Sequence, residues 1–354
     1  SGTITDASGK VLYLEATSSD EAQTLDSVVL GQDGRFSFEG EGHSYPMFYR
    51  LRLGEESIPF AADSLTQLSL TASGDSLFAS YRLTKAEAYN EQIREISHLR
   101  WQTDRAIEAF IASTDGRVPV VAGITGEGTK VAVEEAQRAV DAGATAGLIY
   151  PSHGWLRFGF QPGAPQDRYR AIYEETGLNE ILFQYPDVTK CSYDLDTQLE
   201  IAALPGVHYT KNGVRNMKRW DTEIPVLREA FPDLTIMSCH DEYLLHTMFD
   251  VDGLLVGYGN IAPELLIELL KAGQAHDYDA ARAVHDQLLP VTKTVYHRGS
   301  HMEGTVALKE ALVARGVLET ATVRSPLLPL ADGAHEEIAA ALKAAGLGQA
   351  EIPN

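Results

Sequence analysis

The chain has 354 residues, a formal net charge of −21 at pH 7 and 44% hydrophobic residues. This length accommodates more than one domain with a core of its own. The acidic balance argues against a nucleic-acid or anionic-membrane partner, because binding phosphates requires clustered lysine and arginine. The two cysteines, Cys191 and Cys239, are far apart in sequence, which gives no disulfide framework and favours the cytoplasm.

Residues 1–84 alternate apolar and polar positions in short runs, such as 10–15, 27–30 and 35–39. This two-residue period is typical of half-buried strands, and the turn-forming residues between them favour an antiparallel sandwich. After residue 85 the period becomes helical. We therefore predict a β-sandwich domain at 1–84 and a helical connector at 85–115, in one or two pieces. The connector's apolar positions include Ile93, Ile96, Leu99, Ala106, Ile107 and Phe110.

Short apolar strands alternate with amphipathic helices from residue 116 to 298, at the spacing of strand–helix–strand units. This pattern predicts a parallel sheet covered by helices, as in a β/α barrel or an open doubly wound sheet. The glycines of 123–128 have the wrong offsets for a dinucleotide-binding loop, which disfavours the second fold. More helices form a C-terminal extension at 299–354. The predicted strands are 118–122, 146–150, 181–185, 207–211, 234–238 and 253–257, and the predicted helices include 131–142, 262–272 and 280–294.

A lysine lies at the end of one of these strands. In parallel barrels the reacting groups lie at the carboxyl ends of the strands. Lys211 closes the apolar run 207–211, which has no other charged residue. Burial disfavours the ammonium form of a lysine and leaves a free amine able to attack a ketone. The alternative is a lysine that leaves the barrel mouth and pairs with Asp241 or Glu242.

Three segments carry a family resemblance: residues 117–123, the strand-end Lys211 and residues 257–263. With the terminal helices they resemble the dihydrodipicolinate synthase and N-acetylneuraminate lyase family over residues 113–348. The resemblance implies a β/α barrel with a C-terminal helical extension, usually assembled as a tetramer. It also implies that Lys211 forms an imine with pyruvate or a related 2-oxo acid, without a cofactor. The protonated imine accepts electrons while an adjacent carbon–carbon bond forms or breaks.

Several departures from the family leave the second substrate open. Phe183 stands where the family has a proton-relaying tyrosine, three residues before Pro186, and a phenyl ring carries no proton. Tyr185 and His153 are the candidates to replace it, since either acts as an acid or a base. Residues 187–190 also lack the arginine that holds a second carboxylate in the synthases. Synthesis in the diaminopimelate pathway is therefore not expected.

The first two strand–helix units of the family's barrel have no counterpart in the sequence. Family members begin with two further strand–helix units, and the second ends in a Thr-Thr-Gly-Glu type loop that binds the pyruvate carboxylate. Thr125 begins a similar Thr-Gly-Glu run, but it follows the strand that resembles the family's third. We therefore expect an incomplete barrel of the TIM type, with exposed sheet edges and apolar faces. Thr125 remains a candidate substrate contact.

Other candidate residues lie at or after the predicted strand ends. Arg157 is the candidate for binding a substrate carboxylate, and His240 and Tyr258 are candidate substrate contacts. No metal site is expected, although His153, Cys239, His240 and His246 are potential ligands. Cys239 and His240 are adjacent and would point to opposite faces of a strand, and the position of the next histidine does not fit a zinc motif.

Residues 1–105 resemble a different class, the small β-sandwich domain that precedes thioredoxin-like reductases in some envelope bacteria. The resemblance is carried by residues 2–6, 25–30, 33–38 and 48–54. No Cys-x-x-Cys follows, so redox activity is not implied. If this domain determines the localisation, the chain is periplasmic rather than cytoplasmic. A natural fusion or an artificial chimera is a further interpretation.

Three hypotheses follow. The first is a Schiff-base lyase or aldolase that acts through Lys211 on a small 2-oxo acid and whose N-terminal domain completes the barrel, with a homo-oligomer left open. The second is a binding or structural protein in which an incomplete barrel has lost catalysis. The third is a chimera without a joint function. Trapping of pyruvate on Lys211 by borohydride separates the first hypothesis from the other two.

Overall fold

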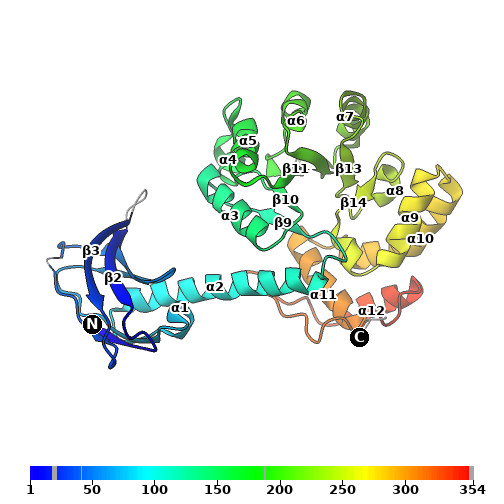
Figure 1. Ribbon diagram of the computed structural model, residues 1–354. Helices are drawn as coiled ribbons and strands as arrows, with labels where there is room; N and C mark the ends of the chain where they lie inside the picture. Colours follow the sequence, from blue (N-terminus) through cyan, green and yellow to red (C-terminus); the bar gives the residue numbers. More distant parts are fainter. Residues whose placement is uncertain (18–21, 41, 187–188, 351–354) are drawn as a thin grey trace. The chain divides into compact units, whose positions relative to one another are not determined.

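The computed structural model describes residues 1–17, 22–40, 42–186 and 189–350, so the last four residues of the expected C-terminal extension lie outside the described residues. The chain divides into two compact units, Ser1–Asp115 and Gly116–Asn354 (Figure 1). Within the described residues, no helix combines the length and the apolar character needed to cross a membrane.

The strands of the first unit form two sheets, each four-stranded within the described residues. The orders are β4-β1-β7-β8 and β3-β2-β5-β6, and side chains from both sheets meet in one hydrophobic cluster that includes Ile4, Leu12 and Ile58. One pair, β1 and β7, is parallel, which departs from the antiparallel sandwich that the turn-forming residues favoured. The strands are β1 (Gly2–Thr5), β2 (Val11–Thr17), β3 (Ala22–Val29), β4 (Arg35–Phe36), β5 (Met47–Leu53), β6 (Glu56–Ala62), β7 (Ser69–Ser73) and β8 (Arg82–Lys85).

Two helices belong to the first unit. The short α1 (Leu77–Ser80) interrupts the expected run of strands, and α2 (Ala88–Thr114) is one continuous helix. The Asn90 side chain fixes the start of α2 to the edge strand β6: its amide oxygen accepts from the Ala61 N–H and its amide nitrogen donates to the Ala61 carbonyl, both at 2.8 Å. His98 of α2 stacks on Phe78 of α1 at 5.1 Å between ring centroids. The first unit therefore combines strands and helices.

The second unit is built on one parallel sheet, with the order β14-β13-β12-β11-β10-β9 in the described residues. The two edge strands, β14 and β9, do not pair with each other in the described residues. The sheet is therefore open, in agreement with the expected incomplete barrel. The first strand begins at Val121, three residues later than predicted. The strands are β9 (Val121–Ile124), β10 (Ala146–Ile149), β11 (Asn179–Gln184), β12 (Val207–Asn212), β13 (Thr235–Ser238) and β14 (Gly253–Leu254).

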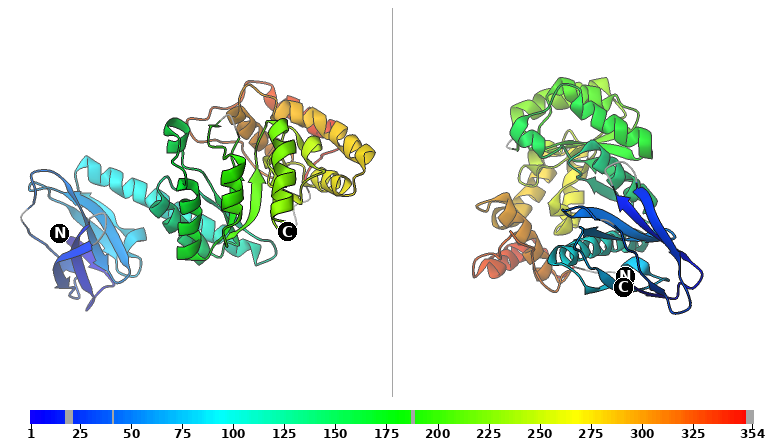
Figure 2. Two further views of the ribbon diagram at one scale, coloured as in Figure 1. Left: turned by 90° about the horizontal axis from the view of Figure 1, so that it is seen from above. Right: turned by 90° about the vertical axis from the view of Figure 1, so that its left-hand side faces the viewer.

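Helices cover one face of this parallel sheet, which we call the outer face; α3, α5, α6 and α7 follow one another around it (Figures 1 and 2). Their apolar side chains pack against Ile124, Ile149 and Leu182 in one cluster and Ile236 in another. The later helices join the second cluster. The helices are α3 (Thr129–Asp141), α4 (Gly154–Phe158), α5 (Ala164–Thr176), α6 (Leu195–Ala202), α7 (Met217–Ala230), α8 (Leu244–Thr247), α9 (Pro263–Gln274), α10 (Tyr278–Val295), α11 (His301–Ala314) and α12 (Ala334–Ala344), with the 3-10 helix η2 (Gly257–Asn260).

The opposite face of the parallel sheet, its inner face, carries the residues that alternate with the outer ones. Ala146, Leu148, Ile181 and Phe183 are buried there against one another. Tyr150, Tyr185, Tyr209, Met237, Cys239 and Leu255 pack against them and are partly buried. The sheet therefore has one face covered by helices and one face of apolar and aromatic side chains that are only partly buried.

Candidate active site

Lys211 lies on β12 beside the aromatic part of the inner face. In the register of the parallel sheet it is the partner of Phe183 on β11 and of Met237 on β13. Its Nζ atom is 4.6 Å from the centroid of the Phe183 ring, and the side chain is half-buried. The alternative partners are engaged elsewhere, since Glu242 pairs with Arg215 and Asp241 accepts a hydrogen bond from the Tyr258 N–H.

Two tyrosine rings pack against the ring of Phe183. Tyr185 lies 4.8 Å and Tyr150 5.1 Å from Phe183, and the two tyrosine rings are 6.0 Å apart, all between centroids. Burial raises the pKa of both phenols. Both are therefore protonated at neutral pH and available as proton donors. The structure brings the predicted Tyr185 to the Lys211 face together with Tyr150, a residue that the sequence did not single out as catalytic.

Cys239 and Arg215 lie next to this group. Burial raises the pKa of the Cys239 thiol, while the positive charges of Lys211 and Arg215 oppose the shift. Both cations are thus close enough to the thiol to act on it. The Arg215 guanidinium pairs with Glu242 at 3.0 Å, and the two side chains are only 19% and 13% exposed. Arg215 is a mostly buried cation that the sequence analysis missed, because it lies in the loop four residues after the end-of-strand lysine.

A carboxylate ties together the loops that follow β9 and β10. Glu127 accepts hydrogen bonds from the Ser152 hydroxyl at 2.9 Å and from the N–H groups of His153 and Gly154, and the His153 Nδ1 atom lies 2.7 Å away. Desolvation raises the pKa of Glu127, but the hydrogen bonds from His153, Ser152 and Gly154 outweigh it and bring the pKa to about 2. Glu127 thus holds the exposed His153, and no contact between His153 and Lys211 is found among the described residues.

Thr125 and Arg157 are exposed. The Thr125 N–H donates to Glu135 at 2.7 Å, which orients its loop. Arg157 lies on the short helix α4, with its guanidinium 5.2 Å from the centroid of the Phe158 ring. Both residues are accessible from solvent, but nothing in their contacts joins them to Lys211.

His240 and Tyr258 occupy places that the sequence analysis did not expect. His240 is fully buried on the outer face, where its ring nitrogens bond the Ser238 hydroxyl and the Val214 carbonyl; burial lowers its pKa to about 4. Tyr258 is fully buried in η2, and its hydroxyl donates to the Leu288 carbonyl at 3.1 Å. Both rings are core groups with their polar atoms bonded. The structure therefore does not bring them to the Lys211 face.

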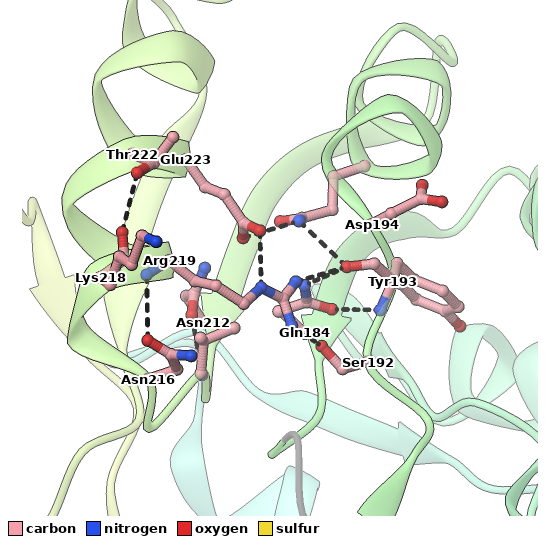
Figure 3. A network of polar contacts seen from close by, with 12 residues as sticks. Gln184, Ser192, Tyr193, Asp194, Asn212, Asn216, Lys218, Arg219, Thr222 and Glu223 are labelled. Atoms are coloured by element: carbon pink, nitrogen blue, oxygen red, sulfur yellow. Dashed lines mark hydrogen bonds and ion pairs between the residues drawn. The ribbon is translucent and has the colours of Figure 1, made fainter.

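The strand end that carries Tyr185 is anchored by a polar network on the outer face (Figure 3). Gln184 exchanges two hydrogen bonds with the backbone of Tyr193, at 2.7 and 2.8 Å. Arg219 of α7 donates to the Tyr193 carbonyl and to the Ser192 hydroxyl, each at 2.8 Å, and to Glu223. This network fixes Gln184 at the end of β11 to Ser192 and Tyr193. Asp187 and Val188, which belong to the segment where the family's arginine is missing, lie outside the described residues.

The acidic, histidine and cysteine side chains form no cluster of three or more suited to a metal ion within the described residues. The arrangement offers instead an amine, two phenols and a guanidinium near one end of a parallel sheet. An amine so placed is the group that covalent carbonyl chemistry uses. Parallel sheets with reacting groups at their carboxyl ends are the architecture of barrel enzymes.

Comparisons with known proteins agree with this class. Residues 95–345 match the Dihydrodipicolinate synthetase family, and residues 1–85 match a domain of unknown function (DUF4369). The chain therefore belongs to the Dihydrodipicolinate synthetase family. The expected likeness of the first unit to the domain that precedes thioredoxin-like reductases is not confirmed.

Individual relatives show the extent of the likeness. The 4-hydroxy-tetrahydrodipicolinate synthase of Ralstonia nicotianae is 31% identical over 248 residues, which are 68% of this chain and 79% of that enzyme. The dihydrodipicolinate synthase of Acinetobacter baumannii, solved with pyruvate, is 26% identical with a TM-score of 0.60, covering 70% of this chain and 81% of that one. The prophage protein YagE of E. coli K12, also solved with pyruvate, has a TM-score of 0.63 at 22% identity, covering 72% and 84%.

Proposed function

We propose that the chain is a Schiff-base lyase or aldolase that acts on pyruvate or a related 2-oxo acid through Lys211. The observation that carries the proposal is the position of Lys211 on the inner face of the parallel sheet, beside Phe183 and close to two phenols. Membership of the Dihydrodipicolinate synthetase family and the pyruvate complexes of its structural relatives supply the substrate class.

The chemistry begins with attack of the Lys211 amine on the carbonyl carbon of the 2-oxo acid. The carbonyl oxygen leaves as water and a protonated imine forms. Loss of a proton from the adjacent methyl carbon gives an enamine, whose carbon attacks the carbonyl of an aldehyde partner. Hydrolysis then releases the product and restores the amine. The reverse sequence cleaves the same bond.

Tyr185 is our choice for the proton carrier in these steps. Its ring packs against Phe183, which in turn contacts the Lys211 Nζ atom. Burial raises the pKa of the phenol, so it keeps its proton until a stronger base takes it. Tyr150 lies 6.0 Å from Tyr185 between ring centroids and offers a second phenol for a relay. The expected role of His153 is less well supported, because its ring is bonded to Glu127 and not to any described residue near Lys211.

Arg215 is our choice for binding the substrate carboxylate. It shares the neighbourhood of Cys239 with Lys211, and its guanidinium offers planar donors suited to a carboxylate. Glu242 keeps the guanidinium in place at 3.0 Å. Arg157, which was proposed from the sequence, is exposed on α4, and no contact among the described residues joins it to Lys211.

The test is intact-mass spectrometry after incubation with pyruvate and borohydride. We expect one reduced adduct on the chain as it stands and none on Lys211→Ala. The matched control is Lys218→Ala, which removes an exposed lysine on α7 and should leave the adduct unchanged. A folded chain without an adduct, or an adduct that survives Lys211→Ala, would count against the proposal and favour the binding or structural hypothesis.

A further inference from the structure

The parallel sheet has free edges at both ends. In the described part of the chain, β9 pairs with β10 and β14 pairs with β13, and neither has a second neighbour. A closed barrel of this type has eight strands, whereas the described residues supply six of them. Because consecutive units are neighbours around a barrel, the missing strands belong between β14 and β9.

The backbone of β9 is arranged to accept another strand. The carbonyls of Val120 and Ile124 accept hydrogen bonds from Thr145 and Tyr150, on the side of β10. Parallel ladders use alternate residues for each side, so the groups of Val121 and Gly123 face the free edge. Apolar side chains also remain at this edge, where Val121 is 39% and Val118 58% exposed. Natural sheets usually protect such an edge with charge, proline or a covering element.

The inner face lacks the side chains that would complete its packing. Barrel interiors are filled in layers of four side chains, contributed by alternate strands. Two missing neighbouring strands remove one member from every layer. This fits the half-buried state of Tyr209, Met237, Cys239 and Leu255, which surround the buried residues of the inner face.

The size of the missing part follows from the comparisons. The matched region covers 79% of the Ralstonia nicotianae enzyme and 81% of the Acinetobacter baumannii chain, so about a fifth of each has no counterpart here. The family match begins at residue 95, inside α2, and therefore already includes a helix before β9. What is missing is two strands and the helix between them, which together are a common folding unit.

We infer that the second unit binds a strand–helix–strand segment of another polypeptide, which pairs with the free edges of β9 and β14 and closes the barrel. The segment pairs in parallel with both edges and brings apolar side chains to the inner face. Its helix covers the outside of the added strands, as the other helices do. This association requires the edges and the inner face only, so it is independent of the proposed chemistry of Lys211.

The test uses the full chain and a peptide that holds the first two strands of the Ralstonia nicotianae synthase with the helix between them. Light scattering after size exclusion should show a one-to-one complex. Amide hydrogen exchange should slow at Val121 and Gly123 in the mixture. Val121→Pro removes an edge-facing N–H, and proline is tolerated on edge strands, so β9 should stay paired with β10. This variant should weaken binding about tenfold or more, whereas Val121→Ala should bind normally.

Three results would overturn the inference. The first is that the full chain and the peptide do not associate. The second is equal binding by Val121→Pro and Val121→Ala, with both variants folded by circular dichroism, because contact would then not use the β9 edge. The third is a dimer of the chain alone that Val121→Pro abolishes, which would make a second copy the occupant of the edge.

Pyruvate trapping separates this inference from the proposed function. A complex that forms but gives no borohydride adduct would sustain the barrel closure and contradict the lyase hypothesis. A Lys211-dependent adduct on the chain alone, with no association, would do the reverse. An adduct whose yield rises when the peptide is added, and does not rise with Val121→Pro, would support both.

Discussion

The two faces of the parallel sheet differ in how far the chain itself completes them. On the outer face, Gln184 and His240 have their polar atoms bonded, and Trp220 of α7 is fully buried. On the inner face, Tyr185 and Met237 are only partly buried beside Lys211. Helices that follow each strand in sequence cover the first face, whereas the second depends on strands from around the whole barrel. Deleting units from a barrel therefore leaves the outer packing intact and opens the interior.

The largest expected effect is on the outer face. Trp220→Ala removes a fully buried ring that lies edge-on to His240 at 4.9 Å between centroids. We expect a loss of about 3–5 kcal/mol in the free energy of unfolding, since a large cavity forms in a core that cannot collapse. Urea denaturation followed by circular dichroism measures it. A loss below that of an inner-face substitution would reverse the comparison.

Glu180 lies on the outer face but, unlike Gln184 and His240, does not have its polar atoms bonded in the described part of the chain. This difference can be tested by varying the pH. Glu180 is fully buried on β11, neither carboxyl oxygen has a hydrogen-bond partner within the described residues, and burial raises its pKa to about 9. The folded state therefore keeps a proton that the unfolded state loses above 4.5, so stability should fall as the pH rises from 4.5 to about 9.

Glu180→Gln should remove this dependence. The variant should resemble the parent in acid and be more stable than the parent by a margin that grows as the pH rises through that range. Urea midpoints measured across the pH series give the difference. Parallel curves for the two proteins would show that Glu180 is ionised or solvated in the folded state.

Met237→Ala tests the inner face directly. Met237 is half-buried and is the register partner of Lys211. We expect a loss of about 1–2 kcal/mol, below the usual range for a buried methionine, because part of the side chain already contacts water. The same urea experiment applies. If the closing segment binds, the loss should increase in its presence, since the site is then enclosed.

Tyr185→Phe should have the smallest effect on stability and a selective effect on chemistry. The ring and its packing against Phe183 remain, so the unfolding free energy should change by less than about 0.5 kcal/mol. Exchange of the pyruvate methyl protons in heavy water should slow about 100-fold, because the phenol that carries the proton is gone. Unchanged exchange would assign that role to another group, with Tyr150 the next to test.

Much of the second unit was predictable because its local pattern is regular. The strand and helix periods located the elements of the parallel sheet to within a few residues, and the run 207–211 placed Lys211 at a strand end. The missing front units were also evident, since six strand patterns cannot close an eight-stranded barrel. These features depend on sequence neighbours, which a single sequence reports well.

Features that depend on which face a residue occupies were harder to predict. His240 and Tyr258 were placed near strand ends correctly, but a strand end presents two faces, and η2 buries Tyr258 in a helix-packed core. Strict alternation from Lys211 and Met237 would have assigned Cys239 to the inner face and His240 to the outer one. The Arg215–Glu242 pair and the contacts of Glu127 join loops far apart in sequence, so no local sequence pattern predicts them.

The Asn90 side chain in the first unit has a consequence for handling the protein. By bonding both backbone groups of Ala61, it occupies part of the β6 edge as another strand would. That sheet edge is therefore blocked against pairing with other molecules at this residue, while β9 offers the exposed Val121 to a neighbour. We therefore expect that aggregation in concentrated solutions occurs through the second unit. An additive or fusion that shields β9 is the rational route to keeping the chain in solution.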